Sequence, residues 1–149
     1  MKPQKSKKRK RPVDKTFAKA FKNYEPPADV PVSEWAEKNR VLSRESSAEA
    51  GPWRNERTPY LVEIMNAFTD PKVEAETFMA GSQVGKSEVI LNLIGRTIAE
   101  DPGSILYIQP TLDDARKFSR LRIAPMIRDC KVLSRKVADV KSRDSGNTM

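Results

Sequence analysis

The segment 78–90, FMAGSQVGKSEVI, constrains the fold of this chain more than any other stretch. Its residues Gly85-Lys86-Ser87 match the end of the phosphate-binding loop pattern G-x-x-x-x-G-K-[ST], but Ala80 stands where the pattern has its first glycine. Gly81 follows directly and is expected to supply most of the missing turn flexibility. Such a loop also needs a short strand before it and a helix after it, because backbone N–H groups and the helix N-terminus must converge on phosphate oxygens.

The segments on either side of the loop have the pattern that it requires. Residues 73–79, VEAETFM, alternate enough to predict a strand, and residues 104–108, SILYI, form the continuous apolar run typical of a parallel strand covered on both faces. Between them, residues 87–100 carry apolar side chains at helical spacing, which predicts a wide buried face: Val89, Ile90, Leu93, Ile94, Thr97 and Ile98. The order strand, loop, helix, strand predicts an α/β fold, an incomplete P-loop NTPase with a parallel sheet and flanking helices.

Three further helices are expected. Residues 32–42, with Ser33 as the N-cap, and residues 59–68 have short amphipathic patterns. Another helix begins at Thr111, where a T-x-x-D capping box places two aspartates at the positive end of the helix dipole. Pro125 should kink or end this last helix.

The charge of the chain lies in its N-terminal tail. Of 28 Lys and Arg and 20 Asp and Glu, residues 1–15 hold eight basic residues and one aspartate, so the remainder is close to neutral. Residues 1–31 are therefore interpreted as a basic tail and proline-rich linker, and residues 32–149 as the part that forms the P-loop domain. Such a tail is either a solubilising arm without a partner or an arm that attracts DNA. The DNA-binding candidates are Lys7, Lys8, Arg9, Lys10 and Arg11.

Several classes of protein are excluded by composition. Cys130 is the only cysteine and there is no histidine, so an internal disulfide, a Cys/His metal cluster and the Ser-His and Cys-His nucleophile pairs are all impossible. No apolar run reaches the length of a membrane span, and no apolar stretch follows the basic N-terminus as in a signal peptide. An intracellular protein without membrane contact is expected, whose chemistry depends on carboxylates, lysine and bound cofactors or metals.

At this point several segments resemble one family. The stretches GPWRNERTPYLVEIMNAFTDP, VEAETFMAGSQVGKSEVILNLIG, SILYIQPTLDDARKFSRLRIAPMI and SRDSGNT, in this order, are similar to the N-terminal ATPase part of the phage terminase large subunit in its lambda-type branch. The resemblance implies an oligomeric motor that packages double-stranded viral DNA into the capsid by ATP hydrolysis. It also implies ATP and Mg²⁺ as cofactors, the small terminase subunit and the portal of the procapsid as partners, and the cytoplasm of a bacterial host as location.

The resemblance also assigns roles to individual residues. Lys86 would bind the β- and γ-phosphates as the catalytic lysine, and Ser87 would be a ligand of Mg²⁺. Tyr60 would stack on adenine and Arg57 would make a polar contact, although core packing is the alternative for Tyr60 and Trp53. The complete nucleotide-binding loop is Ala80, Gly81, Ser82, Gln83, Val84, Gly85, Lys86 and Ser87.

The sequence departs from the family where hydrolysis should occur. ATPases of this kind need an apolar strand that ends in an aspartate for Mg²⁺ and a glutamate that orients water, and the nearest candidate, VADV around Asp139, has too few apolar residues. The clustered carboxylates of the family's nuclease domain are also not found. The chain is thus expected to stop before both and to bind nucleotide without turnover. The alternatives are another P-loop NTPase, helicase-like or kinase, and a non-catalytic nucleic-acid-binding remnant.

Overall fold

The computed structural model describes residues 17, 21, 29–45, 47 and 49–137. Two strands, β1 (Val41–Leu42) and β2 (Gly51–Pro52), and a 3₁₀ turn, η2 (Asn55–Arg57), lie in its N-terminal third. The helices are α2 (Val32–Asn39), α3 (Tyr60–Ala67), α4 (Lys86–Glu100), α5 (Leu112–Phe118), α6 (Ala124–Asp129) and α7 (Lys131–Ser134), and a π-helical turn, η3 (Ser119–Ile123), joins α5 to α6. The basic tail and Asp139 lie outside the described residues.

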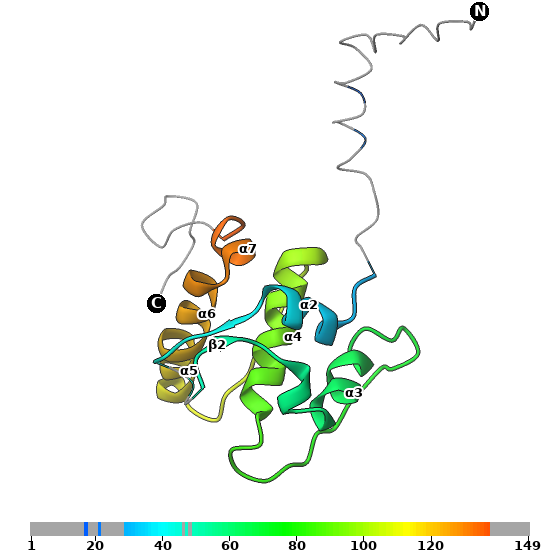
Figure 1. Ribbon diagram of the computed structural model, residues 1–149. Coiled ribbons are helices and arrows are strands. Elements are labelled where there is room, and N and C mark those ends of the chain that lie inside the picture. The colour runs from blue at the N-terminus through cyan, green and yellow to red at the C-terminus, as the bar shows by residue number, and fades with distance from the viewer. Residues whose placement is uncertain (1–16, 18–20, 22–28, 46, 48, 138–149) are drawn as a thin grey trace, which may run out of the picture.

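Helix α4 is the centre of the molecule. It contacts α2 and α3 on one side and α6 and α7 on the other (Figure 1). Trp35 of α2 lies so close to Gly95 that a Cβ at position 95 would collide with the indole ring. Because α4 is covered from two sides, its fully buried face differs from the one that the periodicity predicts and consists of Val89, Leu91, Asn92, Ile94, Gly95 and Ala99. The predicted face is confirmed at Val89 and Ile94, while Ile90, Leu93, Thr97 and Ile98 are only partly buried.

The short strands β1 and β2 form an antiparallel pair beside the helices. Val41 pairs with Pro52 and Leu42 with Gly51, and the backbone of Gly51 has a φ of +129°. Trp53, directly after β2, is buried, and its backbone N–H donates to the backbone carbonyl of Arg40 at 3.0 Å. This pair holds the segment after α2 against the core.

The expected helices are confirmed, with one correction to a helix end and one to a cap. The helix predicted over 32–42 ends at Asn39, because Val41–Leu42 form strand β1. Helix α3 lies within the predicted range 59–68, and α4 begins one residue before its predicted start. Ser33 is not an N-cap: Pro31 takes that position, and Ser33 is buried with its backbone N–H donating to Asn66 Oδ1 of α3 at 3.2 Å. The side-chain oxygen of Asn66 therefore accepts a hydrogen bond from the Ser33 N–H group, which a capping side chain would otherwise have to satisfy.

The long helical segment after Thr111 follows its sequence signals. Thr111 Oγ1 accepts a hydrogen bond from the Asp114 backbone N–H at 3.1 Å, which confirms the predicted cap of α5. Pro125 lies in the first turn of α6, and the π-helical turn η3 comes directly before it. Because proline lacks an N–H group, the regular α-helical hydrogen bonds cannot continue through this point, and the π-helical turn accommodates the interruption.

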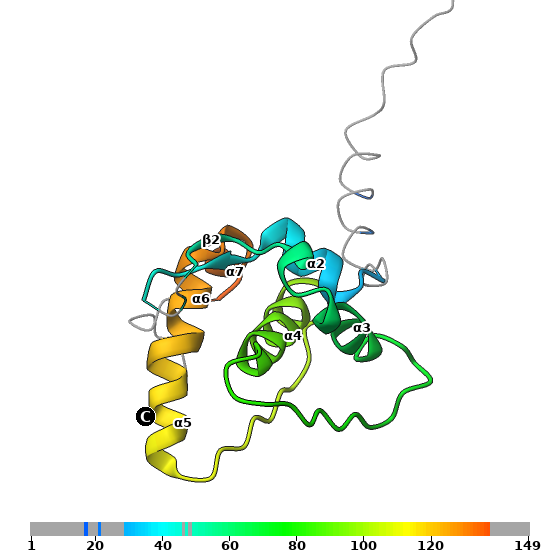
Figure 2. The same ribbon diagram turned by 60° about the horizontal axis from the view of Figure 1, so that its bottom comes forward.

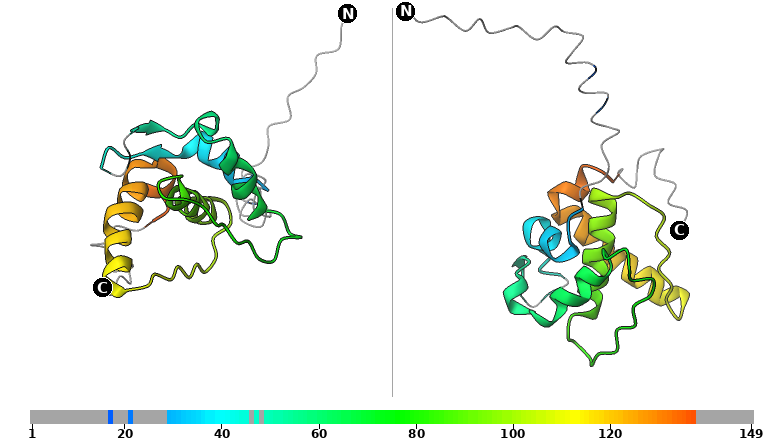
Figure 3. Two further views of the ribbon diagram at one scale, coloured as in Figure 1. Left: turned by 90° about the horizontal axis from the view of Figure 1, so that it is seen from below. Right: turned by 90° about the vertical axis from the view of Figure 1, so that its right-hand side faces the viewer.

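The predicted strands are not formed within the described residues. Residues 73–79 and 104–108 run as irregular connections, one before and one after α4 in the chain, and the only described sheet is the antiparallel pair β1–β2 (Figures 2 and 3). Met79, Leu106 and Ile108 are 95, 85 and 76 % exposed. A strand is defined by hydrogen bonds to a neighbouring strand, and no described segment provides that neighbour for either connection. The prediction of two strands of a parallel sheet is therefore not confirmed by the described residues.

Candidate functional site

The loop before α4 has the backbone geometry of an anion-binding turn. Gly85, the N-cap of α4, has a φ of +91°, and Gln83 two residues earlier has a φ of +60°. Left-handed residues within a turn direct successive backbone N–H groups to one side, which forms a concave site for oxygen atoms. Gly81 has no positive φ, so the flexibility expected of it is not used, and Gln83 makes the turn instead. A side chain in this backbone region is strained, and such strain is typical of functional loops.

Helix α3 fixes this loop from one side. Leu61 is fully buried, and its Cδ1 atom is 2.9 Å from the position that a Cβ at Gly85 would occupy. The Tyr60 hydroxyl donates to the carbonyl oxygen of Val84 at 3.3 Å. The start of α3 thus packs against the start of α4 with no room for a side chain at position 85.

The two residues that follow Gly85 are available to a ligand. Lys86 and Ser87 are both exposed, and the Lys86 ammonium group donates to the carbonyl oxygen of Ala80 at 3.1 Å. The lysine side chain therefore folds back across the loop. The first N–H groups of a helix have no partner inside the helix, and the helix dipole adds a partial positive charge at the same end. This combination can hold a phosphate chain.

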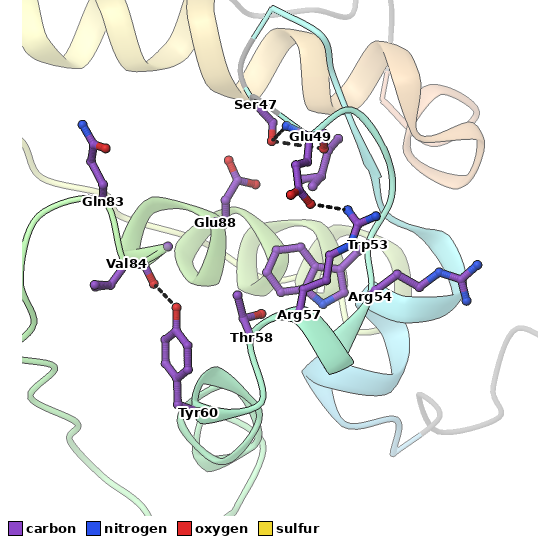
Figure 4. Close-up of a pocket in the computed structure, with 12 residues that line it drawn as sticks. Ser47, Glu49, Trp53, Arg54, Arg57, Thr58, Tyr60, Gln83, Val84 and Glu88 are labelled. Atoms are coloured by element: carbon purple, nitrogen blue, oxygen red, sulfur yellow. Dashed lines mark hydrogen bonds and ion pairs between the residues drawn. The ribbon is translucent and has the colours of Figure 1, made fainter.

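A cleft of about 550 Å³ lies beside the loop (Figure 4). Five of the residues predicted to bind nucleotide line it, namely Arg57, Tyr60, Gln83, Val84 and Gly85. The other predicted loop residues, Ala80, Gly81, Ser82, Lys86 and Ser87, are not among the lining residues. The remaining walls come from Leu42, Ser47, Glu49, Trp53, Arg54, Thr58 and Glu88, none of which was predicted to take part in a site.

The two aromatic residues of the cleft differ in their environment. Trp53 is 5 % exposed, and its Nε1–H donates to Asn55 Oδ1 at 2.8 Å. Tyr60 is 56 % exposed, with its ring beside the loop (Figure 4). Core packing is therefore confirmed for Trp53 and wrong for Tyr60, because Tyr60 is the exposed first residue of α3 while its neighbour Leu61 faces inward. The ring of Tyr60 remains free to contact a flat ligand.

Arg57 carries positive charge into the cleft without being fixed there. Its guanidinium group is 2.9 Å from the carboxylate of Glu49, and both side chains are at least half exposed. An exposed ion pair of this kind contributes little stability, so Arg57 can exchange Glu49 for an anionic ligand. The hydroxyl of the adjacent Thr58 is buried and has no hydrogen-bond partner among the described residues. A bound ligand would have a polar group to satisfy at this point.

Glu88 is the functional candidate that the sequence did not reveal. It occupies the first turn of α4, and its carboxylate accepts from Arg40 Nη2 at 2.9 Å. Arg40 is only 2 % exposed; burial lowers the pKa of its guanidinium group, and the adjacent Glu88 carboxylate opposes that shift. The two residues are 48 positions apart, and no local pattern links them. The one available signal was an acidic residue in the first turn of a phosphate-loop helix.

The residues of the loop fit a metal ion that arrives with phosphates. Mg²⁺ is usually bound by one or two carboxylates together with substrate phosphates and water. The exposed hydroxyl of Ser87 is suitably placed at the start of α4, whereas the nearby Glu88 is engaged by arginine. The described residues contain no cluster of three or more potential ligands from His, Cys, Asp and Glu. Ser87 would thus contribute a single ligand and the nucleotide the others.

Comparison with known proteins identifies the family. Residues 47–149, more than half of the chain, match the family described as phage terminase large subunit gpA, ATPase domain. The chain belongs to this family. Its terminase relatives include the large terminase subunit of Escherichia phage lambda, 31 % identical over 96 residues, which are 64 % of this chain and 15 % of the relative. A second is the large terminase subunit of Enterobacteria phage P21, 29 % identical over 103 residues, 69 % of this chain and 16 % of the relative.

Membership confirms the resemblance found in the sequence. A terminase ATPase domain implies a P-loop NTPase-like α/β fold and the use of ATP, and the matched region includes the loop 80–87 and the residues of α3 beside it. The chain spans about one-sixth of the length of these curated relatives. No solved structure matches the terminase chain. No helix in the described part of the chain has the length and apolar character needed to cross a membrane.

Proposed function

We propose that this terminase chain binds ATP in the cleft beside the loop 80–87, as part of a motor that packages viral DNA. The observation that carries the proposal is the loop itself. Gly85 and Gln83 have left-handed backbones directly before a 15-residue helix, and Leu61 and Tyr60 hold that arrangement in place. Membership of a terminase ATPase-domain family supports ATP as the nucleotide.

Each part of ATP has a complementary group at the loop or in the cleft. The phosphates would lie against the N–H groups at the start of α4, and Lys86 would exchange the Ala80 carbonyl for the β- and γ-phosphates. Tyr60 would stack on the adenine ring, and Arg57 would supply a polar contact. Ser87 would hold Mg²⁺, which neutralises charge on the phosphates when bound.

The wider assembly follows from the family. We propose that the whole protein acts as an oligomer on double-stranded viral DNA in the cytoplasm of a bacterial host. The small terminase subunit and the portal of the procapsid would be its partners. The basic residues Lys7, Lys8, Arg9, Lys10 and Arg11 would attract the DNA backbone in a salt-dependent manner. Residues 73–79 and 104–108 would be strands of the P-loop sheet in the assembled ATPase domain.

A binding measurement tests the nucleotide proposal. The 149-residue chain is titrated with fluorescent N-methylanthraniloyl-ADP and Mg²⁺, and its Kd is compared with that of Lys86→Ala. Lys86→Ala should weaken binding by about tenfold or more, because a charge-assisted contact to phosphate is lost. Lys72→Ala serves as the matched control, since Lys72 is an exposed lysine outside the cleft. Binding that is absent, or equal in the wild type and Lys86→Ala, would reject the proposal.

A further inference from the structure

Glu88 connects the nucleotide cleft to two other parts of the molecule. Its side chain points into the cleft between the loop and the segment of Ser47 and Glu49 (Figure 4). One carboxylate oxygen, Oε2, is 2.9 Å from Arg40 Nη2, and the other, Oε1, is 3.6 Å from Arg122 Nη1 of the π-helical turn. The Glu88 side chain is 16 % exposed, so it belongs partly to the cleft and partly to the core.

Arg40 is anchored more firmly than any other charged side chain near the cleft. Its Nε donates to Asn92 Oδ1 at 3.2 Å, its Nη1 to the Val41 carbonyl at 2.6 Å, and its Nη2 to Glu88. Glu88 and Asn92 are four residues apart in α4, so they lie on the same face in successive turns. The buried guanidinium group of Arg40 therefore forms hydrogen bonds to side chains in both the first and the second turn of α4.

Apart from its packing against Leu61 of α3, the start of α4 has few side-chain bonds that hold it. Gly85 has no side chain to cap the helix, and no side-chain cap is found there. Lys86 and Ser87 are exposed, and the Lys86 contact to Ala80 lies within the loop. Helix ends fray unless they are tied down. Glu88 is the first residue of α4 whose side chain is bonded to a residue outside the loop and the helix.

We propose that Arg40 and Glu88 form a positioning pair for nucleotide binding. Arg40 acts through Glu88 to fix the first turn of α4, and with it Lys86 and Ser87, relative to the cleft. Neither residue needs to touch the nucleotide for this role. The inference rests on the proposed function, because it assigns a positioning role at the same ATP site.

Charge balance explains why the position carries an arginine-bound carboxylate. A free carboxylate in the first turn of α4 would repel the phosphates that the loop is expected to bind. Arg40 and Arg122 on its two oxygens compensate that charge. Glutamine in place of Glu88 keeps an acceptor for Arg40 and the same shape, so it should preserve most of the positioning.

The test is a double-mutant cycle on nucleotide affinity in the 149-residue chain. The variants are Glu88→Ala, Arg40→Met, the double variant and Glu88→Gln. Leu133→Ala is the destabilised control, since Leu133 is buried in α7 and does not line the cleft. The Kd for N-methylanthraniloyl-ADP with Mg²⁺ is measured below the Tm of every variant, with circular dichroism confirming that each is folded.

Coupled losses are the expected result. Glu88→Ala and Arg40→Met should each weaken binding by about tenfold, and the double variant should be no weaker than either single one. Glu88→Gln should stay within about threefold of the wild type, because it retains the acceptor. Leu133→Ala should lower the Tm without a change in Kd. If Arg40→Met does not fold, the affinities of Glu88→Ala, Glu88→Gln and Leu133→Ala still show whether Glu88 has a positioning role.

Three results would overturn the positioning role. Wild-type affinity in Glu88→Ala would show that the pair serves stability alone, and independent losses that multiply in the double variant would show that Arg40 does not act through Glu88. If Leu133→Ala lost as much nucleotide affinity as Glu88→Ala, the pair would again serve stability alone, because general destabilisation of the fold would explain both losses. If the wild type shows no Lys86-dependent binding, the proposed function fails and this role fails with it.

Discussion

Leu61 and Gly85 are in such close contact that the loop depends on the absence of a side chain at position 85. The Leu61 Cδ1 atom is 2.9 Å from the place of a Cβ there, and the φ of Gly85 is +91°. Steric space and backbone conformation thus both require glycine. Leu61 belongs to α3 and Gly85 begins α4, so this contact also sets the distance between the two helices at the cleft.

Gly85→Ala should be damaging. The strained backbone alone costs about 1–3 kcal/mol, and Leu61 must also move. The expected result is a lower Tm and the loss of Lys86-dependent nucleotide binding, measured by circular dichroism and by titration.

Gly81→Ala provides the contrast within the same loop. A Cβ at Gly81 meets nothing within 4 Å, and its φ is not positive. The free energy of unfolding of Gly81→Ala should stay within about 0.5 kcal/mol of the wild-type value, so the two Tm values should be similar. Equal damage from both substitutions would contradict the steric explanation.

Tyr60 should show two separable contributions. Tyr60→Phe removes only the hydroxyl that donates to Val84, and it should weaken the binding of ADP and of tripolyphosphate alike, by about twofold to tenfold. Tyr60→Leu also removes the ring, and a further loss should appear for ADP but not for tripolyphosphate, which has no base to stack. Titration of both ligands with both variants checks this. Similar ADP affinities of the two variants would argue against stacking.

The 149-residue chain should bind nucleotide without turning it over. The carboxylates that line the cleft are Glu49 and Glu88, and each is paired with an arginine, Arg57 or Arg40. Glu88 is therefore not free to orient water for attack on the γ-phosphate, and Glu49 lies neither on the loop nor on α4. Steady-state phosphate release should equal that of Lys86→Ala. Release that depends on Lys86 would show that a carboxylate of this chain orients the attacking water.

Thr111→Ala should destabilise the arm formed by α5 and η3. The Thr111 side chain accepts from the Asp114 N–H and donates to the Asp114 carboxylate at 2.7 Å, and loss of an N-cap costs about 0.5–2 kcal/mol. Hydrogen exchange of the amides in α5 should accelerate. Thr111→Ser keeps the hydroxyl and is the matched control, which should exchange at nearly the wild-type rate.

Glu76→Gln should stabilise the fold at neutral pH. Burial raises the pKa of the Glu76 carboxyl group, whose Oε2 atom has no partner among the described residues. A carboxyl group whose folded pKa is raised destabilises the fold above that pKa, and this penalty disappears below the unfolded pKa of about 4.3. The Tm of Glu76→Gln should exceed that of the wild type at pH 7, with a smaller difference near pH 3.5. An equal difference at both values would show that charge is not the cause.

Local signals predicted the helices and the loop well. Apolar spacing located α4, and the capping box located α5, because both depend on residues within one or two turns of each other. The loop was found from Gly85, Lys86 and Ser87 alone, and its left-handed N-cap agrees with the glycine in the pattern. These features are encoded in short stretches of sequence.

Features that depend on distant partners were not predicted. The apolar run at 104–108 has the composition of a buried strand, but composition cannot supply the neighbouring strand that a ladder requires. The contact of Arg40 with Glu88 joins residues 48 positions apart, and the fully buried face of α4, which differs from the predicted one, depends on helices packed from both sides. Gly81 was expected to supply the flexibility of the turn, but Gln83 has the left-handed backbone instead. The sequence pattern did not indicate this.

The packing of α2 on α4 separates two ways of defining this domain. The region shared with the terminase family begins at residue 47, whereas Trp35 and Arg40 lie before it and supply an indole against Gly95 and a guanidinium against Glu88. A chain begun at the family boundary would expose the groove at Gly95 and leave Glu88 without its closest partner. The region matched to the family is therefore smaller than the packed unit around α4, which includes Trp35 and Arg40.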